Sequence, residues 1–236
     1  KPQEVSAYTA DKLTADVFAL ADALDVQNFT IAGHDWGGAI AWSVALNGQP
    51  GAFNPAWAGR VPRAIIANAP HPYLFQRLLI DDMGQRASSQ YIRAFRDPAN
   101  DSLIREKGLT GLLTQVVKWD KPSNMEPEER AALLADWQDR HACFGMLNWY
   151  RASALVVPAM DEDAEIPAFA AGDFPKLNIP TLLIWAVDDL ALSASNIDGI
   201  EALVPYVTVE QVYDCGHFVI WEKPDVVNAA MAAWLD

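Results

Sequence analysis

The sequence is poor in cysteine and in basic residues, and it has no long apolar run. Its 236 residues include 17 Lys and Arg against 31 Asp and Glu, which gives a formal net charge of −14. Such an acidic chain argues against nucleic acid and membranes as partners. No apolar stretch reaches the ~20 residues that span a bilayer. Two cysteines, Cys143 and Cys215, indicate free thiols in a reducing compartment, so we expect a cytoplasmic protein.

The hydrophobic pattern predicts alternating strands and helices. Four short apolar runs read as buried strands, at residues 28–33, 63–68, 181–187 and 207–213. Helical spacing accompanies them over about residues 9–25, 37–46, 196–203 and 225–235. In the first of these helices the predicted apolar face consists of Leu13, Val17, Leu20 and Leu24. This alternation predicts the α/β class, with a parallel sheet covered by helices.

The middle of the chain has a different pattern. Between residues 71 and 176 there is no convincing strand. Helical stretches occur there instead, at about residues 87–96, 101–118, 126–140 and 144–154. We therefore predict an α/β core made of residues 1–70 and 177–236, with a helical cap of residues 71–176 inserted between two strands.

The segment GHDWGG, residues 33–38, puts an acidic residue where the first predicted strand turns into a helix. Its spacing is that of a nucleophile elbow, G-x-S-x-G, with Asp35 in place of the serine. Small residues at Gly33, Gly37 and Gly38 suit the sharp turn. The N-terminus of the following helix stabilises negative charge, so the carboxylate stays ionised. Aspartate is also a common helix cap, but the complete motif after a buried strand favours a nucleophile.

A carboxylate nucleophile suits displacement at saturated carbon, which leaves an ester on the enzyme. Hydrolysis of that ester needs a base, an acid that orients the base, and an oxyanion hole. His217 lies in the glycine-containing loop after the last predicted strand and is the candidate base. Asp188 and Asp189 follow the preceding strand, and either can be the acid. The order nucleophile, acid, histidine is that of the α/β-hydrolases.

These residues together resemble the epoxide hydrolases of the α/β-hydrolase fold. The likeness runs over essentially the whole chain, and its segments are GHDWGG (33–38), NAPHP (68–72), LNWYR (147–151), WAVDD (185–189) and CGHFVIWEKPDVVNAAMAAWL (215–235). The resemblance implies that Asp189, and not Asp188, is the acid of the triad. It implies that Tyr91 and Tyr150 of the cap are proton donors to the substrate oxygen.

The resemblance also implies a reaction and its reactants. An epoxide becomes a vicinal diol through an ester on Asp35, which is hydrolysed by water that His217 activates. The backbone N–H of Trp36 is one oxyanion donor, and the side chains of Trp36 and Phe218 contact the substrate. A small epoxide and water are then the reactants, and neither a metal nor an organic cofactor is required. The sequence leaves open whether the protein forms a homodimer.

Two other functions remain in competition. One is that of a haloalkane dehalogenase, because the elbow and the histidine segment also resemble those of haloalkane dehalogenases. The departure of a halide, however, needs no pair of tyrosine donors. Arg93 and Ala94 stand where fluoroacetate dehalogenases have a His-Trp halide pair.

The third candidate is a truncated hydrolase fold that binds ligands without turnover. The family has an H-G-x-P loop upstream of the elbow that supplies a second oxyanion donor, and this sequence has none. We therefore expect that the early strands are missing from this chain and that the sheet has an open edge.

Overall fold

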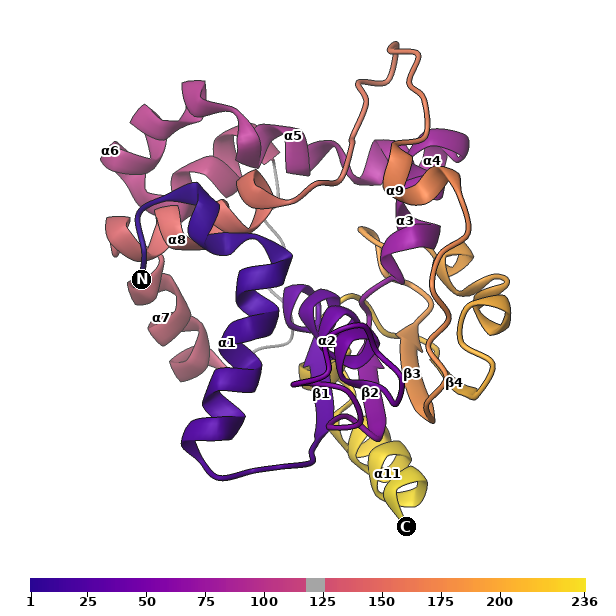
Figure 1. Ribbon diagram of the computed structural model, residues 1–236. Helices are drawn as coiled ribbons and strands as arrows, with labels where there is room; N and C mark the ends of the chain where they lie inside the picture. The colour runs from indigo at the N-terminus through magenta and orange to yellow at the C-terminus, as the bar shows by residue number, and fades with distance from the viewer. Residues whose placement is uncertain (118–125) are drawn as a thin grey trace.

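The structure is a computed structural model that describes residues 1–117 and 126–236 (Figure 1). The strands are β1 (Thr30–His34), β2 (Arg63–Ala67), β3 (Thr181–Ala186) and β4 (Val207–Val212). The longer helices are α1 (Ala10–Ala23), α2 (Trp36–Gly48), α3 (Pro72–Asp81), α6 (Asp101–Leu112), α7 (Pro127–Asp136), α8 (Arg140–Ala152) and α11 (Pro224–Leu235). The shorter ones are α4 (Met83–Ser88), α5 (Gln90–Arg96), α9 (Ala168–Ala171) and α10 (Val219–Glu222), and a π-helix, η3 (Leu113–Val117), continues α6.

The four strands form one parallel sheet in the order β1-β2-β3-β4. Thr30 pairs with Arg63, Ala64 with Thr181, and Thr181 in turn with Val207. Every residue of β3 is buried, as expected for a strand that has neighbours on both sides and helices on both faces. The predicted parallel sheet is therefore confirmed, and β1 is an edge strand among the described residues.

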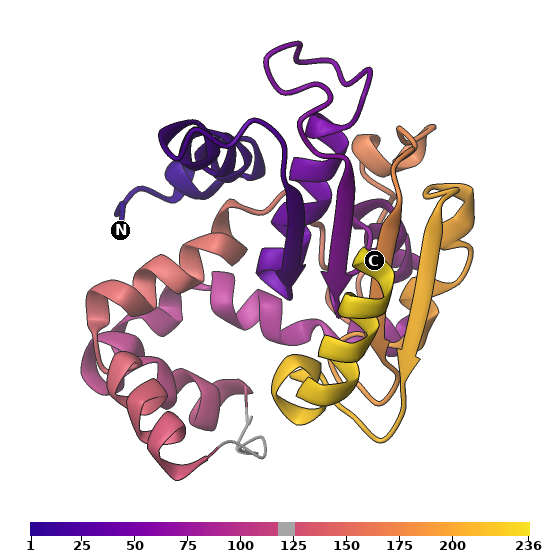
Figure 2. The same ribbon diagram turned by 90° about the horizontal axis from the view of Figure 1, so that it is seen from below.

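Two apolar layers enclose the sheet. On β2 and β3, Ala64, Ile66, Leu183 and Trp185 face the layer that contains α1 and α2. Alternate residues of the same strands face the layer of α10 and α11, and these are Ile65, Ala67, Leu182, Ile184 and Ala186. Figure 2 shows α2 and α11 on opposite faces of the sheet. This period-2 alternation fixes the register and hence the edge at which the strands end.

Helices α3 to α9 come between β2 and β3 in the chain and lie at the end of the sheet to which the strands point (Figures 1 and 2). No strand occurs in the described part of residues 71–176. The division of the chain into a core and a cap at residues 70 and 177 stays a prediction. None of the helices described is long and apolar enough to cross a membrane.

Two predictions about helices are wrong. The predicted helix at 196–203 is two short 3₁₀ turns, because Gly199 lies between them with φ of +73° and interrupts the helical backbone. The predicted face of α1 is wrong in its second half, since Leu13 and Val17 pack against the core but Leu20 and Leu24 are 61% and 65% exposed.

The buried face of α1 has the predicted helical spacing but begins one residue later. Thr14, Phe18 and Ala21 are buried. The Thr14 hydroxyl donates to Ser43 Oγ on α2 at 2.8 Å, and the Phe18 ring stacks on Trp57 at 4.6 Å between centroids. Packing of the large phenylalanine and this hydroxyl pair decides the orientation of the helix, whereas periodicity counts only the leucines.

His71 makes the fold sensitive to acid. Its ring packs edge-on against Trp42 and Phe174, at 5.2 and 5.0 Å between centroids, and neither ring nitrogen has a hydrogen-bond partner among the described residues. Burial lowers the pKa of His71 from 6.5 to about 4. As the pH falls, His71 therefore takes up a proton in the unfolded chain before it does so in the folded one. The stabilising contribution is complete above pH 6.5 and is lost as the pH falls towards 4.

We expect the free energy of unfolding to fall by roughly 2 kcal/mol between pH 7.5 and pH 5 because of this histidine. In a His71→Phe variant this part of the loss is absent. Urea unfolding of both proteins at the two pH values measures it, with the exposed His141→Gln as the control variant. An equal loss in wild type and His71→Phe would show that other groups cause the acid sensitivity.

Candidate active site

The turn between β1 and α2 presents Asp35 at the carboxyl edge of the sheet. Asp35 has φ of +53°, a left-handed backbone that non-glycine residues seldom adopt. A Cβ on Gly33 would lie 2.3 Å from the carbonyl oxygen of Gly37, and one on Gly38 would lie 2.3 Å from Ala69 Cβ. Both positions require glycine, because neighbouring atoms come too close to leave room for a Cβ. A Cβ on Gly37 would meet nothing within 4 Å, so the expectation that this glycine is needed is wrong.

The Asp35 carboxylate is ionised and accessible. Its side chain is 41% exposed, and Oδ1 lies 3.3 Å from His217 Nε2. Burial alone would raise the pKa of Asp35. The hydrogen bond and charge of His217, together with the backbone N–H of Trp36, outweigh this effect and lower the pKa below its ordinary value. The group at the elbow is therefore an anion that can act as a nucleophile at neutral pH.

His217 lies between two carboxylates. Its Nδ1 is 2.7 Å from Asp189 Oδ2, while Nε2 faces Asp35. Burial alone would lower the pKa of His217, but the hydrogen bonds to Asp189 and Asp35 raise it to about 10. The imidazole is thus protonated at neutral pH as long as both carboxylates are charged.

The structure brings Asp189, and not Asp188, to the histidine. The Asp189 side chain is fully buried. Asp188 Oδ2 accepts a hydrogen bond from the backbone N–H of Cys215 at 3.4 Å, so it fastens the start of the histidine loop. The two neighbouring acids therefore have different partners: Asp189 binds the imidazole of His217, and Asp188 binds the backbone of the loop.

Two polar residues of this cluster were missed by the sequence reasoning. Asn68, which follows β2, donates through Nδ2 to Asp189 Oδ2 at 2.9 Å and accepts from the backbone N–H of Ala186 at 2.8 Å. His34, the last residue of β1, donates through Nε2 to the carbonyl oxygen of His217 at 2.7 Å. Their position at strand ends was the available signal, because the carboxyl ends of neighbouring parallel strands meet at one edge.

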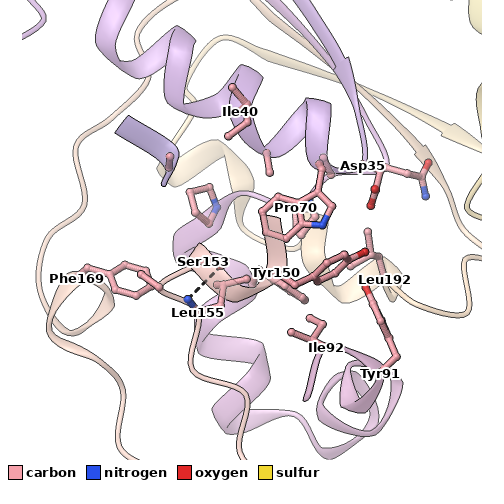
Figure 3. Close-up of a pocket in the computed structure, with 18 residues that line it drawn as sticks. Asp35, Ile40, Pro70, Tyr91, Ile92, Tyr150, Ser153, Leu155, Phe169 and Leu192 are labelled. Carbon is pink, nitrogen blue, oxygen red and sulfur yellow. Dashed lines mark hydrogen bonds between the residues drawn. The ribbon is translucent and has the colours of Figure 1, made fainter. Parts of the chain in front are cut away.

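Tyr91 on α5 and Tyr150 on α8 lie beside the carboxylate. Their ring centroids are 6.1 Å apart, and Figure 3 shows the oxygen ends of both side chains turned towards Asp35. Burial, reinforced by Asp35, raises the pKa of each phenol above its ordinary value. The Trp36 ring also packs edge-on against Tyr150, at 5.1 Å between centroids. Both phenols keep their protons at neutral pH, so each can donate one.

Two cavities meet at these residues, with volumes of about 230 and 560 Å³. Asp35, Trp36, Tyr91 and Tyr150 line both. The smaller cavity, drawn in Figure 3, is otherwise mainly apolar, with walls that include Ile40, Phe75, Ile92, Leu155 and Leu192. The larger one is aromatic, with Phe95, Trp137, Trp149, Phe218 and Trp221 in its walls. The predicted substrate contacts Trp36 and Phe218 therefore both face open space near the carboxylate.

The described residues contain no group of three or more His, Cys, Asp or Glu side chains placed to hold a metal ion. The chemistry of the cluster is that of a carboxylate, an imidazole held by a second carboxylate, and two phenols. Such a set can form an ester, protonate an oxygen and activate water.

The family model of the α/β hydrolase fold matches residues 1–224. One similar solved structure is described as belonging to novel epoxide hydrolases of the alpha/beta hydrolases superfamily from hot-environment metagenomes. It is 59% identical, has a TM-score of 0.92, and is covered over 77% of its chain by all of this one. A Bacillus megaterium epoxide hydrolase in complex with an inhibitor is 26% identical, with a TM-score of 0.77 and coverage of 100% and 78%.

Among curated proteins, the AB hydrolase superfamily protein YfhM of Bacillus subtilis is 27% identical over 236 residues, which are all of this chain and 75% of that protein. Epoxide hydrolase 2 of Caenorhabditis elegans is 22% identical over 241 residues, and the chain spans 62% of its length.

Proposed function

The chain belongs to the α/β-hydrolase fold family and, within it, to the epoxide hydrolases, and we propose that its reaction runs through an ester on Asp35. The enzyme converts an epoxide to a vicinal diol, with water as the second reactant. One observation carries the proposal: two protonated phenols, Tyr91 and Tyr150, lie beside an ionised carboxylate that faces an imidazole. A dehalogenase needs no such donors, because the departing halide takes no proton.

In the first step, Asp35 attacks one carbon of the epoxide ring. A carbon–oxygen ester bond forms, and the ring carbon–oxygen bond breaks with its electron pair on oxygen. Tyr91 and Tyr150 hydrogen-bond that oxygen, and one of them protonates it. Although the pKa of each phenol is raised, an alkoxide is a stronger base than a phenolate, so the transfer is downhill.

The second step depends on a change in the charge around His217. Ester formation removes the negative charge of Asp35, one of the two carboxylates that raise the pKa of the imidazole. With only Asp189 left, His217 gives up its proton more readily, and that proton restores the tyrosine that protonated the epoxide oxygen. The neutral imidazole then acts as a general base and takes a proton from water. Hydroxide then adds to the ester carbonyl, and the Trp36 N–H stabilises the developing oxyanion. The acyl carbon–oxygen bond then breaks, and the diol oxygen leaves with the proton of the added hydroxyl group, which restores the Asp35 carboxylate and leaves His217 protonated as at the start.

The decisive experiment offers the protein two electrophiles. The chain is incubated separately with styrene oxide and with 1-bromobutane, and diol and bromide are measured. We expect diol from styrene oxide and no bromide. Bromide without diol would identify a dehalogenase, and binding of either compound without any product would identify a protein that binds without turnover.

Removal of the phenolic hydroxyls tests the acid. We expect Tyr91→Phe and Tyr150→Phe each to lower kcat for styrene oxide, and the double variant to lose a further part, because each single variant keeps one donor. A loss of ~10²-fold or more in the double variant corresponds to general acid catalysis. Tyr73→Phe, on α3 and outside both cavities, is the matched control. A double variant with the wild-type rate would exclude the tyrosines as proton donors.

A further inference from the structure

Arg96, the last residue of α5, donates from each of its three side-chain nitrogens to backbone carbonyls at the end of α8 and in the segment that follows it. Its Nε donates to the carbonyl of Tyr150 at 2.8 Å, Nη1 to that of Leu155 at 2.7 Å, and Nη2 to that of Ser153 at 3.3 Å. No carboxylate in the described part of the chain forms an ion pair with Arg96. A cation at a helix C-terminus is favoured, because it satisfies carbonyls that have no helical partner.

Arg151 makes the reverse contact, from α8 to the end of α5. Its Nε donates to the carbonyl of Phe95 at 3.2 Å, and its Nη2 is paired with the Asp101 carboxylate at the start of α6. Each arginine therefore holds a terminal carbonyl of the helix that carries the other one. Arg96 follows Phe95 directly, and Arg151 follows Tyr150 directly.

Three aromatic rings of the same two helices pack against one another. The centroid distances are 5.4 Å for Tyr91 and Phe95, 4.7 Å for Phe95 and Tyr150, and 6.1 Å for the two tyrosines, all with edge-to-face geometry. Each such pair contributes only a small stabilisation beyond the burial of its area. Hydrogen bonds from a planar guanidinium are directional and fix the register of the two helices.

We propose that Arg96 and Arg151 form a reciprocal clamp that sets the positions of Tyr91 and Tyr150, an inference that rests on the proposed function of these tyrosines. Arg96 is a positioning residue in this arrangement, since it holds the backbone of one tyrosine from the helix of the other. It also fixes Ser153 and Leu155, which line the smaller cavity (Figure 3). The clamp thereby aligns the proton donors with one wall of the substrate site.

The test separates ester formation from ester hydrolysis. Arg96→Lys and Arg96→Met are mixed with excess styrene oxide and quenched, and the ester on the Asp35 peptide is followed by mass spectrometry. We expect ester formation to slow by ~10²-fold in Arg96→Met, as a displaced reacting group does, and by less in Arg96→Lys. Hydrolysis of the ester, which uses His217, keeps the wild-type rate.

Arg93 supplies the matched control. It lies on the same helix, donates to the carbonyl of Val157 at 2.9 Å and faces Glu162 at 3.6 Å, and its side chain forms no hydrogen bond or ion pair with the described residues of α8. Arg93→Lys and Arg93→Met are therefore expected to leave both rates unchanged. Added guanidinium ion should restore ester formation in Arg96→Ala and have no such effect on wild type.

Wild-type ester formation in Arg96→Met would overturn the clamp. So would an equal slowing of both steps without rescue by guanidinium, because that pattern reports a general loss of folding. If Arg96→Met does not fold, the same two rates in Arg96→Lys decide the question. A wild-type protein that forms no ester would instead overturn the proposed function.

Discussion

We expect diol formation to fall by ~10⁶-fold when Asp35 is replaced by asparagine, the scale seen when a hydrolase loses its nucleophile. The amide is uncharged and a poor nucleophile, so no ester forms and the second step has no substrate. The fold should survive the change. Asn is nearly isosteric with aspartate and branches in the same way at Cγ, so it meets the same neighbours at the same backbone angles. The measurement is kcat for styrene oxide, with the side chain verified as an amide because deamidation would regenerate the enzyme.

A second readout follows from the same variant. Asp35→Asn removes one of the two carboxylates that raise the pKa of His217 to about 10, so the pKa of the imidazole should fall, and an NMR titration can follow it. Asp188→Asn is the matched control, because Asp188 contacts the loop backbone and not the imidazole. Turnover near the wild-type rate in Asp35→Asn would exclude a covalent route through this residue.

The sequence predicts those parts of the fold that depend on local pattern. Three strands lie within the predicted runs and β1 overruns its run by one residue, to His34, because a buried parallel strand is a short apolar segment that ends at a glycine or polar residue. The orientation of α1 was not predictable in this way. Its leucines and its Thr14–Phe18–Ala21 face have nearly the same spacing, and only the partner helix decides between them.

The residues of the candidate site likewise differ in how well the sequence predicts them. Asp35 and His217 could each be located from a motif, because the residues of the elbow follow one another in the sequence, and so do those of the glycine-histidine loop. Asn68 and His34 have only the weaker signal of a position at a strand end, since their hydrogen bonds form only when neighbouring strands end at one edge. The arginine clamp is even harder to predict from the sequence, because its bonds between α5 and α8 end on backbone carbonyls, which any residue type can supply.

A His217→Gln variant should accumulate the ester that wild type hydrolyses. Attack by Asp35 needs no base, so ester formation continues, whereas the attack of water loses its proton acceptor. Removal of a general base costs ~10²–10⁴-fold, and steady-state diol formation should fall by that amount. Mass spectrometry of the protein after reaction with styrene oxide should then show one added substrate, located on the peptide that contains Asp35.

The pH dependence of ester formation gives this variant a second signature. His217 is the main group that lowers the pKa of Asp35, against the effect of burial. Glutamine carries no charge, so the pKa of Asp35 rises in the variant, and ester formation is lost at a higher pH as the solution is acidified than in wild type. His141→Gln, on the surface, should show neither the trapped ester nor this shift. Slow diol formation by His217→Gln with no adduct on the Asp35 peptide would mean that water attacks the epoxide directly.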